Sequence, residues 1–256
     1  MAKEEFVKVT GNTILITGGG TGIGLALAKV FVEADNEVII CCRRTNKLKD
    51  AKLQLPKLHI FPCDIANANQ RQMLFQRMME NFPKLNILIN NAGIQNHLDF
   101  KMGLANLLKG EDEIETNLRA PIHLAALFIP HLMKQEPAAI INVSSGLGFV
   151  PMAIMPVYCA TKAALHSFSL SLRHQLRETS IKVFEIIPPT VDTNLDRGAR
   201  RQQGRTDRGI TPSEVAQATL QALSADENEV AVGRAQWLRT GSRQEPEKLF
   251  QILNGA

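Results

Sequence analysis

Short apolar runs alternate with helical patterns along almost the whole chain, and this alternation restricts the possible folds more than any other feature. The runs are rich in β-branched residues and are apolar along their whole length, which is typical of strands that are covered on both faces. Strands that are separated by helices predict a parallel sheet whose crossovers are right-handed. We therefore predict an α/β fold, a single doubly wound domain with a parallel sheet of about seven strands and helices on both faces.

The predicted elements follow one another without a linker or a shift in composition, so we expect one domain over residues 1–256. The predicted strands are residues 12–17, 37–42, 57–62, 86–90, 138–144, 182–187 and 230–232. The predicted helices are residues 22–34, 69–81, 112–134, 156–178 and 212–223. Residues 192–211 lack a regular pattern, and we expect them to form a loop or lid beside the substrate.

The composition excludes several classes of protein. With 45% hydrophobic and 21% charged residues, the chain is not intrinsically disordered. Its 29 basic and 25 acidic residues leave a net charge of +4, which is too small to indicate nucleic-acid binding. No run approaches the roughly 18 apolar residues of a membrane-spanning helix, and the N-terminal residues lack the pattern of a signal peptide. We therefore expect no membrane partner and a cytoplasmic location.

The cysteines and histidines are not spaced as metal ligands, so we expect no metal site. The four cysteines, Cys41, Cys42, Cys63 and Cys159, form no C-x-x-C pair, and the six histidines show no i, i+4 pairing. We interpret the cysteines as reduced thiols, which fits the cytoplasmic location.

A glycine-rich turn, TGGGTGIG at residues 17–24, joins the first predicted strand to the first predicted helix. Without side chains, backbone N–H groups can approach a phosphate closely, and the helix N-terminus adds partial positive charge. Flexible loops are also rich in glycine, but the order of strand, glycines and helix favours a dinucleotide site in a Rossmann-type domain. The residues expected to contact the dinucleotide here are Gly18, Gly20, Thr21, Gly22, Ile23 and Gly24.

The end of the second strand indicates which nicotinamide cofactor is bound. An acidic residue there would accept a hydrogen bond from a ribose 2′-hydroxyl and repel a 2′-phosphate. Cys42 occupies that place, and Arg43 and Arg44 follow it. Guanidinium groups pair well with phosphate oxygens, so NADP(H) is favoured over NAD(H). Two arginines in an ordinary solvated turn are the alternative interpretation.

The single tyrosine of the chain, Tyr158, lies four residues before Lys162 near the start of a predicted long helix. That separation places both side chains on one helical face. A neighbouring ammonium stabilises tyrosinate and lowers the phenol pKa from about 10. Such a phenol can give or take the proton of a carbonyl–alcohol pair. Taken alone, a buried tyrosine at a core position is the simpler interpretation.

These features together resemble the short-chain dehydrogenase/reductase family. The resemblance rests on the glycine turn, NNAG at residues 90–93, Asn117, Ser145 thirteen residues before Tyr158, YCATK at 158–162 and PPTVDT at 188–193. It covers about residues 10–235, with the elements in the family's order and spacing. The C-terminal section, residues 229–239 and 246–254, resembles oxidoreductases named for lipoteichoic acid D-alanylation operons, a name that identifies no substrate.

The resemblance implies a role for each of these residues. Tyr158 would be the general acid and base, Lys162 would lower its pKa and hold the nicotinamide ribose, and Ser145 would hydrogen-bond the substrate oxygen. Asn117 would support a water that links Lys162 to solvent. Asp64 would lie beside the adenine. The further cofactor contacts would come from Ile65, Asn91, Ala92, Gly93, Pro188, Val191 and Thr193.

The predicted substrate wall lies between Ser145 and Tyr158 and after the sixth strand. It includes Leu147, Met152 and Pro189, which together with Ser145 and Tyr158 would contact the substrate. An apolar wall suits a hydrophobic ketone or aldehyde, although methionines are also common in plain cores. Pro189 departs from the family's usual Pro-Gly pair, which makes this wall stiffer.

We expect an enzyme, an NADP(H)-dependent oxidoreductase that transfers a hydride between the nicotinamide and a small-molecule carbonyl or alcohol substrate. The alternatives are a ketoacyl-type reductase that serves an acidic carrier protein and a non-catalytic dinucleotide-binding regulator. By resemblance, helices 112–134 and 156–178 would pair in a homodimer or homotetramer. Five arginines would close a lid or contact a carrier, or else belong to a solvated loop: Arg197, Arg200, Arg201, Arg205 and Arg208.

Overall fold

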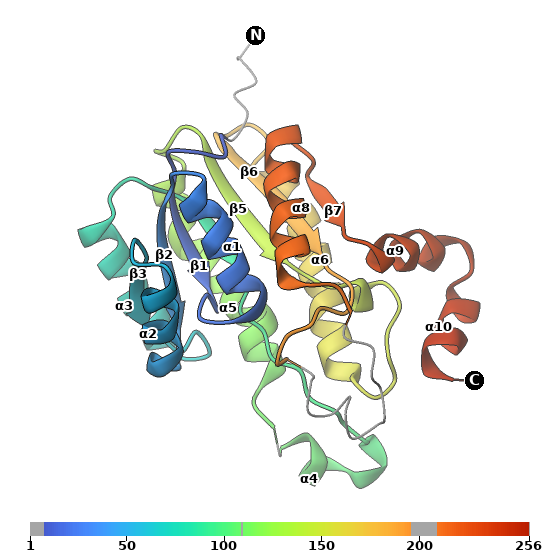
Figure 1. Cartoon of the computed structure of the whole chain (residues 1–256). Coiled ribbons are helices and arrows are strands. Elements are labelled where there is room, and N and C mark those ends of the chain that lie inside the picture. Colours follow the sequence, from blue (N-terminus) through green and yellow to red (C-terminus); the bar gives the residue numbers. More distant parts are fainter. Residues whose placement is uncertain (1–7, 109, 196–208, 256) are drawn as a thin grey trace.

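The computed structural model describes residues 8–108, 110–195 and 209–255, which form a seven-stranded sheet with every strand pair parallel (Figure 1). The strand order is β3-β2-β1-β4-β5-β6-β7. The strands are β1 (Thr13–Thr17), β2 (Glu37–Cys42), β3 (His59–Pro62), β4 (Leu85–Asn90), β5 (Ala138–Val143), β6 (Ile181–Ile187) and β7 (Glu229–Ala231). The predicted doubly wound sheet is confirmed, and each strand begins and ends within two residues of its predicted range.

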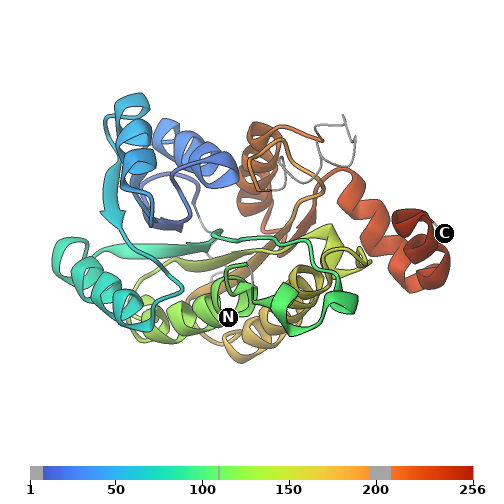
Figure 2. The ribbon, with the colours of Figure 1, turned by 90° about the horizontal axis from the view of Figure 1, so that it is seen from below.

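Helices cover both faces of the sheet (Figure 2). One face carries α1 (Gly22–Glu33), α2 (Thr45–Gln54) and α8 (Pro212–Ala225). The other face carries α3 (Ala68–Asn81), α5 (Ala120–Leu132) and α6 (Pro156–Gln175). The short α4 (Leu104–Leu107) lies away from the sheet, and α9 (Arg234–Gln244) and α10 (Pro246–Asn254) lie beyond β7 (Figure 1). Within the described ranges, no helix is long and apolar enough to cross a membrane.

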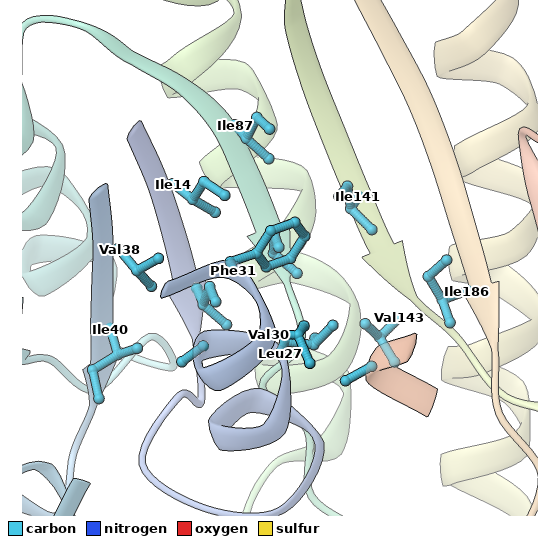
Figure 3. Close-up of a cluster of buried hydrophobic side chains, with 14 of the residues drawn as sticks. Ile14, Leu27, Val30, Phe31, Val38, Ile40, Ile87, Ile141, Val143 and Ile186 are labelled. Carbon is cyan, nitrogen blue, oxygen red and sulfur yellow. The ribbon is translucent and has the colours of Figure 1, made fainter. Parts of the chain in front are cut away.

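Alternating side chains of each strand supply two separate cores. Ile14 of β1 lies on the side of the sheet that faces α1, with Leu27 and Phe31 (Figure 3). Ile16 belongs to the same cluster, and all four side chains are fully buried. Leu15, between Ile14 and Ile16, belongs to the core on the opposite face. Burying one such side chain contributes about 1.5–3 kcal/mol. The strands are therefore apolar throughout because both of their faces are covered.

The predicted helix over residues 112–134 is irregular in the structure. A π-helical stretch, η2 (Glu115–Arg119), precedes α5, which ends at Leu132. Asn117 lies within this stretch, and its side-chain amide bonds to the backbone of Ile94. A regular helical period was the wrong expectation here, because π turns form around tertiary contacts that sequence periodicity does not contain.

The sequence analysis did not predict α2, α4, α9 or α10. α2 buries only Leu48 and Ala51, and α9 buries only Ala235 and Leu238. Two buried positions in about three turns give a weak periodic signal. Packing against the rest of the domain therefore decides these helices more than their own apolar pattern does.

The predicted loop or lid at 192–211 is described only at its two ends. The backbone N–H of Asp192 donates to the carbonyl oxygen of Ile210 at 2.8 Å, so the two ends lie side by side. The five predicted loop arginines at 197–208 lie outside the described residues.

Candidate active site

A cavity of about 1940 Å³ opens at the carboxyl ends of the strands, beside the adjacent β1 and β4. In doubly wound sheets this is the point where the strand order reverses and where ligands bind. Seventeen residues predicted to contact the cofactor line the cavity: Gly18, Gly20, Thr21, Gly22, Ile23, Arg43, Arg44, Asp64, Ile65, Asn91, Ala92, Gly93, Tyr158, Lys162, Pro188, Val191 and Thr193. The substrate residues predicted beside Tyr158 line it too: Ser145, Leu147, Met152 and Pro189. Gly24 and Asn117 lie behind its wall.

Two glycines of the turn have no room for a side chain. Gly18 adopts a φ of +67°, and a Cβ on it would lie 2.8 Å from the Cα of Ala92. A Cβ on Gly24 would lie 2.5 Å from Asn91 Nδ2 and equally close to the carbonyl oxygen of Gly18. The turn thus packs directly against the end of β4. The Thr21 side chain does not cap α1, which leaves N–H groups of its first turn for an anionic ligand.

Hydrogen bonds between neighbouring strand ends hold this packing in place. Thr17 Oγ1 accepts the backbone N–H groups of Asn91 and Ala92 at 3.0 and 3.1 Å. Asn91 Nδ2 donates in return to the carbonyl oxygen of Thr17 at 2.9 Å. The ends of β1 and β4 are therefore a single unit, and the backbone of Ala92 and Gly93 lies along the cavity.

Tyr158 and Lys162 lie together near the start of α6, whose first residue is Pro156, a favourable first position for a helix. Lys162 Nζ is 5.7 Å from the centroid of the Tyr158 ring and donates to the carbonyl oxygen of Val143 at 2.8 Å. Both side chains are buried. Burial lowers the pKa of Lys162 to about 8, against the opposing charge of Glu185. The Lys162 ammonium, which lies beside the phenol, therefore loses its proton at a lower pH than an ordinary lysine does.

Two adjacent serines follow β5, and their hydroxyl groups have different partners. Ser144 Oγ donates to a carboxylate oxygen of Glu185 at 2.5 Å, on the neighbouring strand. Ser145 Oγ instead accepts the backbone N–H of Leu147 at 3.1 Å. The hydroxyl proton of Ser145 can consequently be donated to a ligand in the cavity. This arrangement supports Ser145 over Ser144 as the substrate-binding serine.

Asn117 is fully buried and joins two segments behind the cavity. Its amide accepts the backbone N–H of Ile94 at 2.9 Å and donates to the Ile94 carbonyl oxygen at 2.8 Å. It also donates to Thr161 Oγ1, next to Lys162, at 3.2 Å. A Cβ on Gly93 would lie 3.4 Å from Asn117 Oδ1 and 3.7 Å from Lys162 Nζ. Asn117 thus positions the segment that separates it from the cavity.

A buried charge network lies under β5 and β6, and the sequence analysis missed it. Glu185, fully buried, binds Ser144 through one oxygen and His166 Nδ1 at 2.7 Å through the other. Its hydrogen bond raises the pKa of His166. Ligand atoms of His166, Glu185 and Glu229 lie within 4.8 Å of one another, but Arg173 already donates to Glu229. We interpret the group as an ion-pair network, whose only signal in the sequence was a glutamate in an apolar strand.

Leu147, Met152 and Pro189 contribute apolar atoms to the cavity wall. Other lining residues were not predicted, because they come from a loop after β4 and from the unpredicted C-terminal helices: Gln95, Arg234, Trp237, Leu238, Ile252 and Leu253. Trp237 is the single tryptophan of the chain, and its side chain is 43% exposed.

Comparisons with known proteins agree with this geometry. The chain matches the family model for short chain dehydrogenases over residues 12–204. It is 52% identical, over 248 residues, to an uncharacterised oxidoreductase of Bacillus subtilis (strain 168), DltE, covering 97% of this chain and 98% of that protein.

Solved structures share the same fold. A short chain dehydrogenase/reductase from Burkholderia phymatum, solved with NAD, superimposes with a TM-score of 0.84 at 21% identity and covers 98% of each chain. A short chain dehydrogenase from Burkholderia cenocepacia, solved with NADP, gives a TM-score of 0.80 at 25% identity, covering 96% of this chain and 99% of that one. On the family match and the identity to DltE, this chain belongs to the short-chain dehydrogenase family of oxidoreductases.

Proposed function

We propose that this protein is an NADP(H)-dependent oxidoreductase that interconverts a hydrophobic ketone or aldehyde and its alcohol. The observation that carries the proposal is the grouping of Ser145, Tyr158 and Lys162 on the wall of the same cavity as the glycine turn. Carbonyl reduction needs a hydride source, a proton donor and a partner for the developing charge on oxygen. These residues supply the second and third of these requirements.

The cavity fits a nicotinamide dinucleotide. Side chains at Gly18 or Gly24 would collide with the neighbouring backbone and Asn91, so the turn leaves only backbone beside a pyrophosphate. Arg43 and Asp64 line the end expected for the adenosine, and Lys162 lines the end expected for the nicotinamide ribose. When bound, the reduced nicotinamide would supply the hydride to the carbonyl carbon.

The protein's own residues would manage the proton. Tyr158 would donate its hydroxyl proton to the carbonyl oxygen while Ser145 donates a hydrogen bond to the same oxygen. Lys162, close to its titration point, would stabilise the phenolate that remains. Asn117 would act as a positioning residue, because it is bonded to Thr161 beside that lysine.

Arg43 and Arg44 support the choice of NADP(H). Both line the cavity, and β2 ends in Cys42 rather than in a carboxylate that would repel a 2′-phosphate. Replacing Arg43 by Ala should weaken NADPH binding by about 1–3 kcal/mol and spare NADH. A wild-type preference for NADH, or an equal loss for both cofactors, would contradict the assignment.

A panel of ketones and aldehydes, assayed with NADPH and with NADH, tests the activity itself. We expect turnover of apolar substrates and a preference for NADPH. Carrier-linked ketoacyl substrates represent the alternative function, and activity on them should fall with added salt if an acidic carrier is recognised. Activity on carrier-linked substrates alone would reject the proposed substrate class.

We also propose a homodimer or homotetramer that pairs through α5 and α6. Large apolar side chains near or on these helices are 50%, 52% and 43% exposed in the single chain: Ile114, Met133 and Leu170. Light scattering of the purified protein tests the assembly, and charged substitutions at Leu170 should dissociate it. A cytoplasmic location is proposed on the cysteine pattern, and all four cysteines are free in the structure.

A further inference from the structure

Arg43, the residue expected to meet a 2′-phosphate, already has an anionic partner. Its Nη1 lies 2.5 Å from Oε2 of Glu111, and both side chains are about half exposed on the cavity wall. Glu111 belongs to the segment between β4 and η2, far from Arg43 in the sequence. A carboxylate thus reaches the end of β2 from a different part of the chain.

Glu111 is held in place by more than this ion pair. Asn96 Nδ2 donates to the backbone carbonyl oxygen of Glu111 at 3.0 Å. The backbone N–H of Asn96 donates to the carboxylate of Glu113 at 3.0 Å, and Glu113 is buried. A Cβ on Gly110 would lie 2.7 Å from the side-chain amide of Asn96, so Gly110 and Asn96 are closely packed. These bonds hold the backbone of Glu111 beside the segment after β4, and the ion pair then places its carboxylate on Arg43.

The position has a direct electrostatic consequence. A 2′-phosphate carries a charge of about −1.5 to −2 and would seek the same guanidinium donors that Glu111 uses. It would have to displace the carboxylate or accept its repulsion at close range. A 2′-hydroxyl is uncharged and would meet neither cost.

We propose that Glu111 is a cofactor-selectivity residue, which supplies the carboxylate that the end of β2 lacks and so reduces the preference for a 2′-phosphate over a 2′-hydroxyl. This inference rests on the proposed use of a nicotinamide dinucleotide. Arg43 attracts the phosphate and Glu111 opposes it, so the balance of the two sets the cofactor ratio.

The test is calorimetric binding of 2′,5′-ADP and of 5′-AMP, which differ by the phosphate alone. Glu111→Gln keeps the shape of the side chain and removes its charge. We expect it to tighten 2′,5′-ADP binding about fivefold and to leave 5′-AMP unchanged. Because both charged groups are half exposed, the gain should shrink as ionic strength rises. Glu178→Gln is a matched control, since Glu178 is exposed and paired with Arg177 away from the cavity.

Arg43→Ala distinguishes a failure of the role proposed for Glu111 from a failure of the NADP(H) assignment. In that background Glu111→Gln should tighten 2′,5′-ADP binding less than it does when Arg43 is present, because only the direct repulsion is then relieved. If Arg43→Ala weakens 2′,5′-ADP while Glu111→Gln has no effect, the NADP(H) assignment stands and the role of Glu111 is wrong. A loss of 5′-AMP binding in Glu111→Gln also overturns it, because the carboxylate would then hold ribose hydroxyls. If Arg43→Ala does not change 2′,5′-ADP binding, the assignment itself fails.

Discussion

At the scale of single residues, the proposed chemistry depends on a phenol and an amine that share one helical face. The sequence places its single tyrosine, Tyr158, four residues before Lys162, but it does not say whether either side chain is buried. In the folded chain Tyr158 and Lys162 are 6% and 4% exposed, respectively. That burial lowers the pKa of Lys162 to about 8, so its amine exchanges a proton at mildly alkaline pH.

Tyr158→Phe should cut turnover by a factor of about 100 or more, because it removes the proton donor. Binding of NADPH, followed by calorimetry, should stay nearly unchanged, since other groups hold the phosphates and ribose. Ser145→Ala should also lower turnover. The double variant should fall short of additivity because both hydroxyls act on one oxygen. Full activity in Tyr158→Phe would show that Tyr158 is not the proton donor.

Lys162 also makes stability depend on pH, and the sign follows from its lowered pKa. Below about pH 8 the folded state holds a buried ammonium at full cost, and between about 8 and 10.5 the unfolded chain binds the extra proton. The free energy of unfolding should therefore rise over that interval, by up to about 3 kcal/mol relative to Lys162→Met.

Denaturant titrations at several pH values test this, in a Tyr158→Phe background that removes titration of the phenol. The difference between the lysine and methionine chains should change steadily from pH 8 upward. A difference that is independent of pH would mean that the lysine is not desolvated as the structure indicates.

At the scale of elements, β6 contributes a buried glutamate, Glu185, as well as apolar core residues. Its Glu185 ties the strand to Ser144 at the end of β5 and to His166 on α6. One buried carboxylate thus links β6 to β5, which Ser145 follows, and to α6, which carries Lys162. Apolar periodicity predicted the strand correctly but gave no account of this residue, because a buried charge is tolerated only where its partners lie.

Glu185→Gln should lower the free energy of unfolding by about 3–5 kcal/mol, because Ser144 and His166 would lose the buried carboxylate that they bind. The loss has a pH signature. The pKa of His166 is raised in the folded state, so its stabilisation is present below the unfolded value of about 6.5 and is lost as pH rises through the raised pKa.

Denaturation of both chains between pH 5 and 9 provides the measurement. The wild-type advantage should be larger at the acidic end of the range than at the alkaline end. His166→Gln should remove most of that pH dependence while keeping a polar partner for the carboxylate. An advantage that grows with pH would contradict the assigned pairing.

At the scale of the whole molecule, the C-terminal helices complete the cavity wall. α10 packs through Leu249 against Val150 and Leu238, which come from the segment after β5 and from α9. Residues of both helices line the cavity, including Trp237 and Ile252. The two C-terminal helices and the glycine turn near the N-terminus therefore line the same cavity.

Leu249→Ala should destabilise the protein by about 2–5 kcal/mol, the usual cost of truncating a buried leucine. It should raise KM for apolar substrates while leaving the affinity for NADPH unchanged, because Leu238 and Leu253 of this cluster line the cavity and none of its members is a proposed cofactor contact. Phe250→Ala is a suitable control, since that neighbouring side chain is 41% exposed. Equal effects of the two substitutions on KM would show that α10 does not shape the substrate end.

The sheet, its parallel direction and the place of the glycine turn could all be read from the sequence, because they depend on local patterns. Apolar strands and glycine order are properties of neighbouring residues, and the structure confirms the seven parallel strands and the turn between β1 and α1. The π turn at Asn117, the Glu185 network, the reach of Glu111 to Arg43 and the C-terminal wall could not be read in that way. Each depends on contacts between segments distant in the chain, and those contacts exist only once the sheet has brought the segments together.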